Sequence, residues 1–405
     1  MTLLLLACTG GSLVVDGPVT DDSAIGDSSR PVDTSHDIEE VPGVGELSDV
    51  LFNDEVLPEF DVLLSDEAFS SLASDPYNWV EGGIVFDGVT YEGIGVRVKG
   101  ENSYLPISQK ASLKLKFDKY DPDMRFLKLE ELTLNNMSND YSMMHERLSY
   151  RQFRESGLPA PRANHALVSI NGEHVGLYTV LETVDRDFIK RWYDNTEGPM
   201  FEVWDVDFKD YYIDSFQLEF GEDDRTQLQG VADTLEDSGD DAYEAAAEYL
   251  DWEQFTKWWA NGIIVGQYDG YPYADPGDDC HVFVNQDNLG PAGGPRLEWI
   301  PHGMDETYYY PTGVAVLTQV NGIVAKRCTN VAQCQDMVVE QMNVGLDRQD
   351  EIGTLEYFDM VEAQIKDHVT ADTNKNYTDE YVWYYQDAMR SFIASRRSDL
   401  SRWTD

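Results

Sequence analysis

The sequence predicts an α+β fold, with an antiparallel sheet region first and helices dominating later. Alternation of apolar and polar residues is concentrated between residues 60 and 117, whereas helical periodicity with capping residues appears after residue 226. The chain has 405 residues, 42% of them hydrophobic and 12% aromatic. This is enough for one large domain or two closely packed lobes.

The first region begins near Val50 and is predicted to hold one short helix among strands. Residues 60–64 (FDVLL) read as a strand, and residues 66–72 as a helix capped by Ser65 or Asp66. Three further strands are predicted in GGIVFDG, TYEGIGVRVKG and KASLKLKF. In the last of these, Leu113, Leu115 and Phe117 alternate with Ser112, Lys114 and Lys116. The basic face is either a solvated sheet face or a platform for an anion such as phosphate.

The stretch from Glu131 to Tyr193 carries the most specific pattern in the chain. A helix over residues 143–156 contains Arg147 and ends at Gly157. A PxP turn then leads into the strand ALVSI, and an Asn-Gly turn launches the strand HVGLYTVLE, which ends at Glu182.

The later region is predicted to be mainly helical. Residues 200–212 read as a strand with its loop, and residues 227–249 as an acidic helical segment broken at Gly239. An amphipathic helix starts from Asp251 as N-cap and ends at Gly266. A last helix spans residues 379–403, with arginines near its end that suit the helix dipole.

The net charge of -47, from 76 acidic and 29 basic residues, argues against nucleic-acid binding, which needs a basic surface. The acidity indicates calcium binding, a salt-rich milieu or simply a well-solvated surface. No apolar run reaches the length of about 18 residues that spans a membrane.

The first eight residues end in L-L-A-C, which resembles the processing site of a bacterial lipoprotein with Cys8 as the lipidated residue. The basic segment of a signal peptide is missing, so either the true start lies upstream of Met1 or the motif is accidental. We favour lipidation, with residues 9–49 as an acidic disordered tether and the folded domain at residues 50–405. We therefore expect a protein anchored by lipid to a membrane, at the cell envelope or extracellular surface.

If Cys8 is lipidated, Cys328 and Cys334 are close enough in sequence to close a small disulfide loop in an oxidising compartment. Cys280 is then left over. No CxxC or HxxxH spacing accompanies the cysteines, which argues against a zinc site.

The run from Glu131 to Tyr193 resembles the spore coat protein H (CotH) kinase-like family, whose members read R-x-x-L-x-Y … GLPAPR … NGE-x-x-GLY-x-x-x-E-x-V-D. The resemblance covers about residues 51–403. It implies an atypical protein-kinase-like two-lobed domain, with a sheet lobe at about 50–200 and a helical lobe at about 201–405. It also implies that ATP and Mg²⁺ (or Mn²⁺) are bound. The chain has no GxxxxGK[ST], HRD or DFG motif, so generic kinase motifs alone would miss it.

The resemblance implies a set of nucleotide-binding residues in the sheet lobe. The turn from Lys99 through Ser103 is similar to the family's KGNSS turn, whose backbone N–H groups could approach a phosphate; the alternative is a plain hairpin turn. Lys110, Lys114 and Lys116 match its K-x-x-x-K-x-K-F stretch, and Lys114 is the preferred phosphate partner. Glu182 is expected to pair with this lysine or contact the nucleotide. Arg147 is expected to be structural.

The resemblance places the catalytic and metal-binding residues in the helical lobe. Asp269, in QYDGYPY, is the expected general base, although Asp-Gly is also a common turn. Asp305, in HGMDETY, is the expected Mg²⁺ ligand, and Gly303 stands where the family has a further Asp. His281 occupies the position of a metal-binding Asn. Because imidazole is a poor ligand for Mg²⁺, Asn285 or Asp279 are alternatives. His302 is expected to serve in packing.

These observations predict an atypical kinase that phosphorylates Ser, Thr or Tyr hydroxyls of a surface or coat protein. The alternative is a catalytically inactive scaffold of the envelope or surface, and a calcium-dependent adhesion module is a third option that rests on charge alone. Two other patterns are dismissed. His145-Glu146-Arg147 lacks the second His of HExxH, and residues 372–376 imitate the start of a calcium loop but read as a turn before a helix.

Overall fold

Seven strands form a closed barrel in the first half of the chain. The computed structural model describes residues 47–236, 239, 241–309 and 316–404, which belong to one compact unit. The barrel order is β1-β2-β3-β4-β5-β7-β6, and β1 closes it by pairing in parallel with β6. The strands are β1 (Glu59–Leu63), β2 (Val80–Phe86), β3 (Val89–Lys99), β4 (Ser112–Lys116), β5 (Glu131–Asn135), β6 (Ala163–Ile170) and β7 (Glu173–Glu182).

Alternation along these strands decides which side chains fill the barrel. Val96 and Val98 of β3 and Leu113 and Leu115 of β4 are fully buried, while the intervening basic side chains are only partly covered. The β6–β7 hairpin turns at Asn171 and Gly172, whose φ angles of 51° and 79° are the left-handed values that this dipeptide tolerates. The strands predicted between residues 60 and 182 are therefore confirmed.

Two of the predicted helices are capped as predicted. The side chain of Ser65 accepts the Ala68 N–H at the start of α1 (Asp66–Ser74). Asp251 accepts two backbone N–H groups at the start of α6 (Trp252–Val265), which ends at Gly266 with a φ of 70°. The helix predicted over residues 143–156 is α2 (His145–Glu155).

A second sheet lies within the region that was expected to be mainly helical. Its order is β11-β10-β8-β9, with every neighbouring pair antiparallel. The strands are β8 (Met200–Val203), β9 (Gln217–Phe220), β10 (Cys280–Leu289) and β11 (Pro295–Pro301). The sequence reading found β8 alone, because β10 and β11 are joined through the glycine-rich segment Gly290–Gly294 and carry mixed polar residues. The expected lobe is thus a mixed α/β region.

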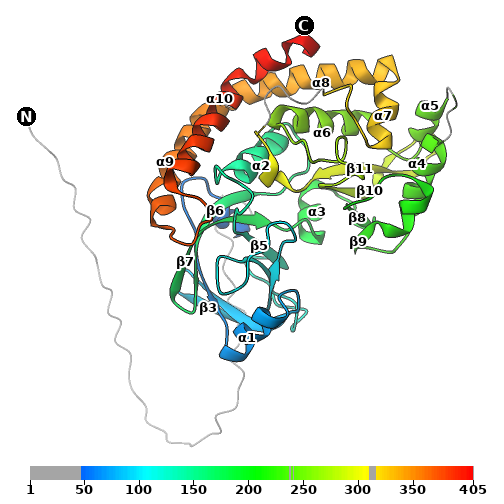
Figure 1. Ribbon diagram of the computed structural model, residues 1–405. Coiled ribbons are helices and arrows are strands. Elements are labelled where there is room, and N and C mark those ends of the chain that lie inside the picture. Colours follow the sequence, from blue (N-terminus) through cyan, green and yellow to red (C-terminus); the bar gives the residue numbers. More distant parts are fainter. Residues whose placement is uncertain (1–46, 237–238, 240, 310–315, 405) are drawn as a thin grey trace, which may run out of the picture. The chain divides into compact units, whose positions relative to one another are not determined.

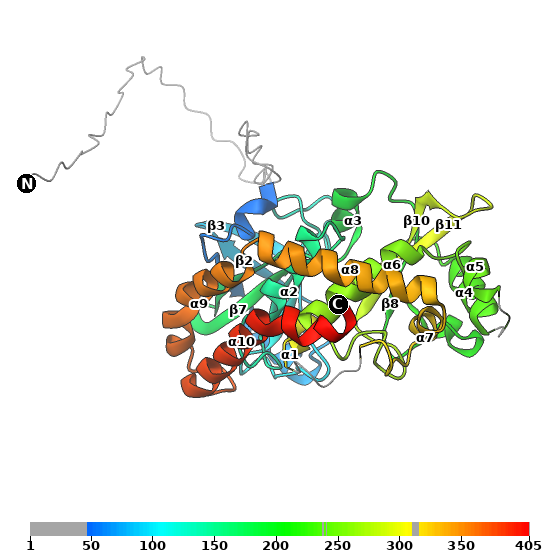
Figure 2. The ribbon, with the colours of Figure 1, turned by 90° about the horizontal axis from the view of Figure 1, so that it is seen from above.

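Four helices complete the C-terminal part of the fold: α7 (Ile323–Thr329), α8 (Ala332–Glu351), α9 (Thr354–Ala371) and α10 (Asp379–Thr404). Figure 1 shows α8 and α10 running past α6 and α2, with α9 beside the barrel strand β7. Figure 2 shows α8 and α10 on either side of α6 when they are viewed from above. Of these helices only α10 was predicted individually. The turn at residues 372–376 precedes α10, as expected.

The remaining elements are short: η1 (Leu47–Leu51), α3 (Arg186–Trp192), η2 (Asp210–Ser215), α4 (Thr226–Glu236), α5 (Ala242–Ala246) and η3 (Met304–Glu306). The sulfur atoms of Cys328 in α7 and Cys334 in α8 are joined in a disulfide, and Cys280 is a buried free thiol. Within the described ranges, no helix combines the length and the apolarity needed to cross a bilayer. The expected lipidation residue Cys8 lies outside the described residues, as does almost all of the expected tether.

Candidate active site

The outer face of β3 and β4 presents basic side chains toward the second sheet. Arg97 and Lys114 are cross-strand partners, and Lys99 is two residues farther along β3. Burial and the neighbouring Lys114 lower the pKa of the Lys99 ammonium, while the carboxylates of Glu146, Asp305 and Glu202 oppose this shift. Lys99 thus connects the barrel electrostatically with α2, with η3 and with β8 of the second sheet.

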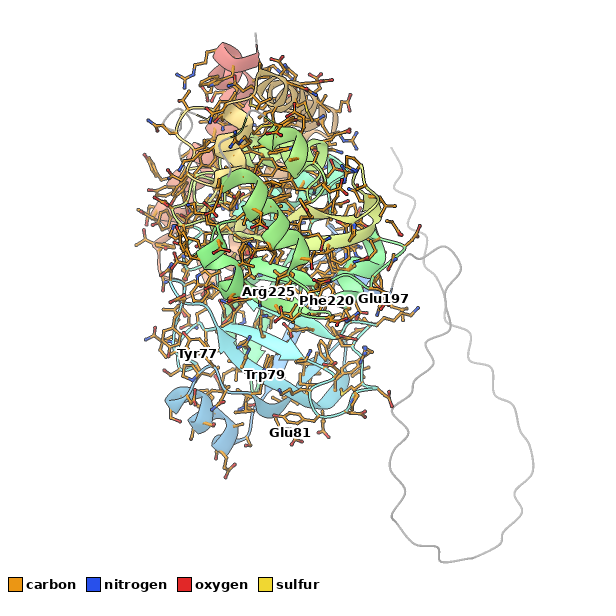
Figure 3. All side chains as sticks on the ribbon, turned by 90° about the vertical axis from the view of Figure 1, so that its right-hand side faces the viewer. Tyr77, Trp79, Glu81, Glu197, Phe220 and Arg225 are labelled. Atoms are coloured by element: carbon orange, nitrogen blue, oxygen red, sulfur yellow. A yellow bond between two sulfur atoms is a disulfide. The ribbon has the colours of Figure 1, made fainter. Side chains whose placement is uncertain are left out.

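Figure 3 looks toward the side on which the barrel and the second sheet meet. Trp79 and Tyr77 lie on the barrel, and Phe220 of β9 and Arg225 lie above them. The guanidinium of Arg97 stacks over the Trp79 ring at 4.9 Å, so this ring covers part of the outer face of β3. On the same face, Lys99 and Lys114 both interact electrostatically with Glu202 of the second sheet.

The helix α2 contributes a buried carboxylate, Glu146, which the sequence reading did not assign to the site. Its Oε1 accepts a hydrogen bond from Asn135 Nδ2 at 3.0 Å, and its Oε2 has no hydrogen-bond partner among the described residues. Burial and the nearby Asp305 raise the pKa of Glu146, whereas Lys99 lowers it. A buried carboxylate oxygen without a partner is costly unless something outside the chain satisfies it.

The short helix η3 holds Asp305 against α2. The His145 ring Nδ1 lies 2.8 Å from the Asp305 carbonyl oxygen, and the Ser149 hydroxyl lies 2.9 Å from that of Thr307. Burial raises the pKa of Asp305, and the Lys99 ammonium opposes this. The contacts fix η3 beside the first two turns of α2, which places the Asp305 and Glu146 side chains in one electrostatic environment.

The loop that follows α6 brings two more carboxylates to the same place. Asp269 has no hydrogen bond or ion pair within the described part of the chain, and burial together with Glu306 raises its pKa. Asp279 has a φ of 57°, and burial and its neighbours Asp278, Asp305 and Asp269 raise its pKa well above the usual value. Asp269 and Asp305, the expected base and metal ligand, therefore both lie close enough to Asp279 to act on it electrostatically.

The phenol of Tyr150 on α2 is influenced by the same carboxylates. Burial raises the pKa of Tyr150 well above its usual value, and the carboxylates of Glu146, Asp305 and Asp279 act in the same direction. Residues from α2, from η3 and from the segment just before β10 are thus close enough to act on the Tyr150 phenol.

Two histidines flank this group of carboxylates. The rings of His281 and His302 meet edge to face at 4.7 Å, and His302 Nε2 lies 3.6 Å from Glu202 Oε1. Burial lowers the pKa of His281 to about 4 and that of His302 well below its usual value, so both rings are neutral near pH 7. His281 Nδ1 has no hydrogen-bond partner among the described residues.

Several residues expected at the site are engaged elsewhere. Glu182 pairs with Arg162 at 2.8 Å and with Arg191 at 2.9 Å, so the expected Lys114–Glu182 ion pair is not formed. Lys114 instead lies 3.0 Å from Glu131 Oε1, because β5 is the strand that neighbours β4.

Lys116 and Asn285 are also held by neighbours of their own. Lys116 pairs with Asp118 at 3.1 Å and lies 3.8 Å from Glu131. Asn285 lies four residues along β10 from His281, and its side chain donates a hydrogen bond to Glu298 Oε1 at 2.8 Å. It is therefore not brought to the carboxylates of Asp279 and Asp305.

Arg147 and Lys110 are structural. Arg147 is fully buried and donates hydrogen bonds to the Tyr357 hydroxyl, to Gln364 and to His165, which agrees with the expected structural role. Lys110, the first lysine of the basic stretch, forms a buried ion pair with Asp372.

The donor set of the site fits a hard divalent cation. Asp305, Asp279 and Glu146 offer carboxylate oxygens, and Glu146 Oε2 is a buried oxygen that no group of the described residues satisfies. Mg²⁺ prefers such oxygen ligands and keeps several waters or phosphate oxygens of its own, so a loose protein cage suffices.

A tighter acidic group lies elsewhere. Among the described residues, Glu130, Asp185 and Asp187 have ligand atoms within 4.8 Å of one another. Asp185 caps the N-terminus of α3 by accepting two backbone N–H groups, and Asp187 pairs with Lys190 at 2.7 Å. The side chains of Asp185 and Asp187 are thus already bonded within the protein, and the group stabilises the start of α3.

Comparison with a protein-family model shows to which family this chain belongs. The model described as CotH kinase protein matches residues 96–400, which is most of the chain and includes every residue of the site. The chain belongs to the CotH kinase family. The CotH resemblance predicted from residues 131–193 is therefore confirmed.

One curated CotH-type relative is the inner spore coat protein H of Bacillus subtilis (strain 168). The two chains are 24% identical over 197 residues, which is 45% of this chain and 53% of the relative. This chain thus spans about half the length of the curated relative that it matches.

Two solved structures align at low similarity. The proinflammatory kinase CtkA of Helicobacter pylori aligns with 81% of this chain and 90% of its own at 8% identity, with a TM-score of 0.31. The HipA–HipB–operator DNA complex of Shewanella oneidensis MR-1 aligns with 84% and 82% at 10% identity, with a TM-score of 0.35. These scores are too low to add to the assignment, which rests on the family model.

Proposed function

We propose that this protein is an atypical kinase that uses ATP and a divalent metal ion to phosphorylate a hydroxyl group of a protein. The observation that carries the proposal is the position of Lys99, whose ammonium is electrostatically coupled to Glu146 on α2 and to Asp305 on η3. Phosphoryl transfer needs a cation for the phosphates and carboxylates for the metal in one place. Membership of the CotH kinase family supports the same activity.

The basic outer face of the barrel is the proposed phosphate-binding surface. The ammonium groups of Lys99 and Lys114 both interact electrostatically with Glu202 of the second sheet. Their positive charge would neutralise the nucleotide phosphates during transfer. We assign Lys99 to this role first, because Lys114 shares its charge with Glu131. Lys116 and Glu182 would act at most indirectly, since each is paired with its own neighbours.

Asp305 is the proposed metal ligand, with Glu146 as a second carboxylate beside it. A bound Mg²⁺ or Mn²⁺ would supply charge stabilisation for the phosphates. The protein's part is to hold Asp305 through η3, which the contacts of His145 and Ser149 with η3 fix in place.

Asp269 is the proposed general base. Its carboxylate has no partner among the described residues, and a pKa above the usual value makes it a better proton acceptor than an exposed carboxylate. It would take the proton of the substrate hydroxyl while that oxygen bonds to the γ-phosphorus of ATP and the bond to the leaving ADP oxygen breaks. The alternative, that Asp269 is only a turn residue, predicts no loss of activity on its replacement.

The substrate is proposed to be a Ser, Thr or Tyr residue of a coat or surface protein. The name of the curated relative, an inner spore coat protein, supports an association with a coat or surface. A lipid anchor on Cys8 would place the enzyme at a membrane and remains part of the proposal, as does the oxidising compartment that the Cys328–Cys334 disulfide suits.

The test is phosphate incorporation by the full chain from labelled ATP with Mg²⁺ or Mn²⁺. Asp269→Asn and Asp305→Asn are compared with Asp275→Asn, which removes an exposed charge from the loop after α6. Incorporation lost in the first two variants and kept in the third is the expected result. Absence of both nucleotide binding and incorporation in the unmodified chain would overturn the proposal and favour the inactive scaffold.

A further inference from the structure

Gly303 and Asp279 share a space that only one side chain can fill. A Cβ atom built on Gly303 would lie 1.9 Å from Asp279 Oδ1 and 2.2 Å from its Cγ. Real Cβ contacts are never this short, so the Asp279 carboxylate occupies the volume in which a side chain of residue 303 would stand. Gly303 has a φ of 61°, and Asp279 has a φ of 57°. Both backbones adopt the left-handed conformation that brings the two segments together.

The Asp279 carboxylate is not used by the protein itself. Its backbone takes part in hydrogen bonds: the N–H donates to Asp278 Oδ1 at 2.8 Å, and the carbonyl accepts from the His302 N–H at 3.3 Å. Its side-chain oxygens make no hydrogen bond or ion pair in the described part of the chain. The protein therefore fixes the main chain of Asp279 and leaves the carboxylate free for a ligand.

The surroundings of this carboxylate indicate what the ligand is. Asp305 and Asp269 are close enough to Asp279 to raise its pKa. Asp305 acts in the same way on Glu146 of α2, which has an unpartnered buried oxygen, Oε2. Glu146 itself is only 3% exposed. Several carboxylates that converge with unused oxygens repel one another unless a cation lies among them. An all-oxygen set of this kind suits Mg²⁺ or Mn²⁺ rather than a soft metal.

We infer that the Asp279 carboxylate also binds the metal ion held by Asp305, and that glycine at position 303 is required to admit this carboxylate. The inference rests on the proposed function and assigns a role within the same site. It also settles the choice among the candidates for the second ligand. Asn285 is hydrogen-bonded to Glu298, and His281 offers an imidazole, which is a poor Mg²⁺ ligand.

The test measures Mn²⁺ binding to the full chain without nucleotide, by the loss of the free-ion electron paramagnetic resonance signal. Asp279→Asn removes the charge, and Gly303→Ala places a methyl group where the carboxylate stands. We expect each to weaken the Mn²⁺ dissociation constant by about tenfold or more, since even outer-shell replacements cost about that much. Asp275→Asn is the matched control and should stay within about twofold, because this exposed residue lies outside the group.

An exchange variant separates a ligand effect from a folding effect. Asp279→Gly combined with Gly303→Asp moves the carboxylate to the other side of the same space, and both positions have backbones that glycine and aspartate tolerate. We expect the exchange to recover Mn²⁺ binding relative to Asp279→Gly alone. Circular dichroism melting of each variant shows whether it is folded.

The outcomes distinguish this inference from the proposed function. Mn²⁺ binding that weakens in Asp279→Asn and Gly303→Ala supports the inference, even if the unmodified chain incorporates no phosphate. Unchanged Mn²⁺ binding in folded Asp279→Asn, with binding lost in Asp305→Asn, overturns the inference and leaves the kinase proposal standing. Absence of Mn²⁺ binding by the unmodified chain, with and without ATP, overturns both.

Discussion

The ammonium of Lys110 lies 2.7 Å from Asp372 Oδ2, and both side chains are almost completely buried. Lys110 belongs to the loop between β3 and β4, and Asp372 ends α9, so the pair ties the barrel to the C-terminal helices. The same Asp372 oxygen accepts the Leu177 N–H of β7 at 3.0 Å. Burial lowers the pKa of Lys110, and Asp372 opposes this shift.

We predict that Lys110→Met destabilises the protein by about 3–5 kcal/mol, because it leaves the buried Asp372 charge without its cation. The measurement is the free energy of unfolding in urea. The matched control is Arg390→Met, which breaks the exposed pair with Asp359 and should cost about 1 kcal/mol or less. Equal losses of unfolding free energy in the two variants would contradict the prediction, because the buried pair would then stabilise the protein no more than the exposed pair.

Lys99→Met is predicted to weaken nucleotide binding about tenfold or more, since a charge-assisted contact is worth about 1.5–3 kcal/mol. Lys116→Met serves as the comparison, because it removes a lysine from the same outer face that is already paired with Asp118. The dissociation constant for ATP with Mg²⁺, by titration calorimetry, provides the check. A larger loss in Lys116→Met than in Lys99→Met would contradict the assignment.

For Asp269→Asn we predict a fall in the rate of phosphate incorporation of about 10²–10⁴-fold, with nucleotide affinity nearly unchanged. The expectation follows from a carboxylate that makes no hydrogen bond or ion pair with a described residue and therefore adds little to folding. Steady-state kinetics with parallel binding measurements separate the two effects. A variant that loses ATP affinity and rate together would argue for a structural Asp269.

His165 is predicted to make stability depend on pH. Burial and the neighbouring Arg147 guanidinium lower the pKa of this imidazole to about 3. Arg147 Nη1 donates to its Nδ1 at 3.1 Å, and its Nε2–H donates to the Met143 carbonyl at 2.6 Å, so the folded protein holds the ring neutral. The unfolded chain binds a proton below the ordinary value of about 6.5.

Stability should therefore fall by roughly 1.4 kcal/mol per pH unit from this group as the pH drops from about 6.5 toward 3. Urea unfolding between pH 7 and pH 4 measures the slope. His165→Gln should remove this part of the slope, whereas His174→Gln, at an exposed position of β7, should leave it in place. An unchanged slope in His165→Gln would contradict the prediction.

The local part of the fold could be predicted because its signals are local. The alternation of Val96, Val98, Leu113 and Leu115 decides the barrel interior, and Asp251 and Gly266 mark the two ends of α6. The barrel closure could not be predicted in this way. It depends on the parallel pairing of β1 with β6, more than 100 residues away, and nothing within either strand specifies that partner.

Only those residues of the candidate site that belong to short sequence motifs could be predicted. Asp269 and Asp305 were predicted from short patterns, and in the structure both act electrostatically on Asp279. Glu146 was missed because its neighbours His145 and Arg147 suggested only a failed zinc motif. What marks Glu146 is its burial: it is a carboxylate in α2, a helix whose first residues are all buried in the structure. The ion pair between Lys114 and Glu131 depends on which strand neighbours β4, and the residue pattern within one strand does not specify its neighbour.

The closure of the barrel by β1 has a practical consequence for producing shorter versions of the protein. A fragment that starts at residue 96, where the match to the family model begins, would lack β1, β2 and most of β3. Strand β6 would then lose the partner that pairs Phe60 with Val168 and Val62 with Ile170, and its backbone would become an open edge able to recruit other chains. Expression of such a fragment should yield aggregates, so the shortest folded unit has to begin before Glu59.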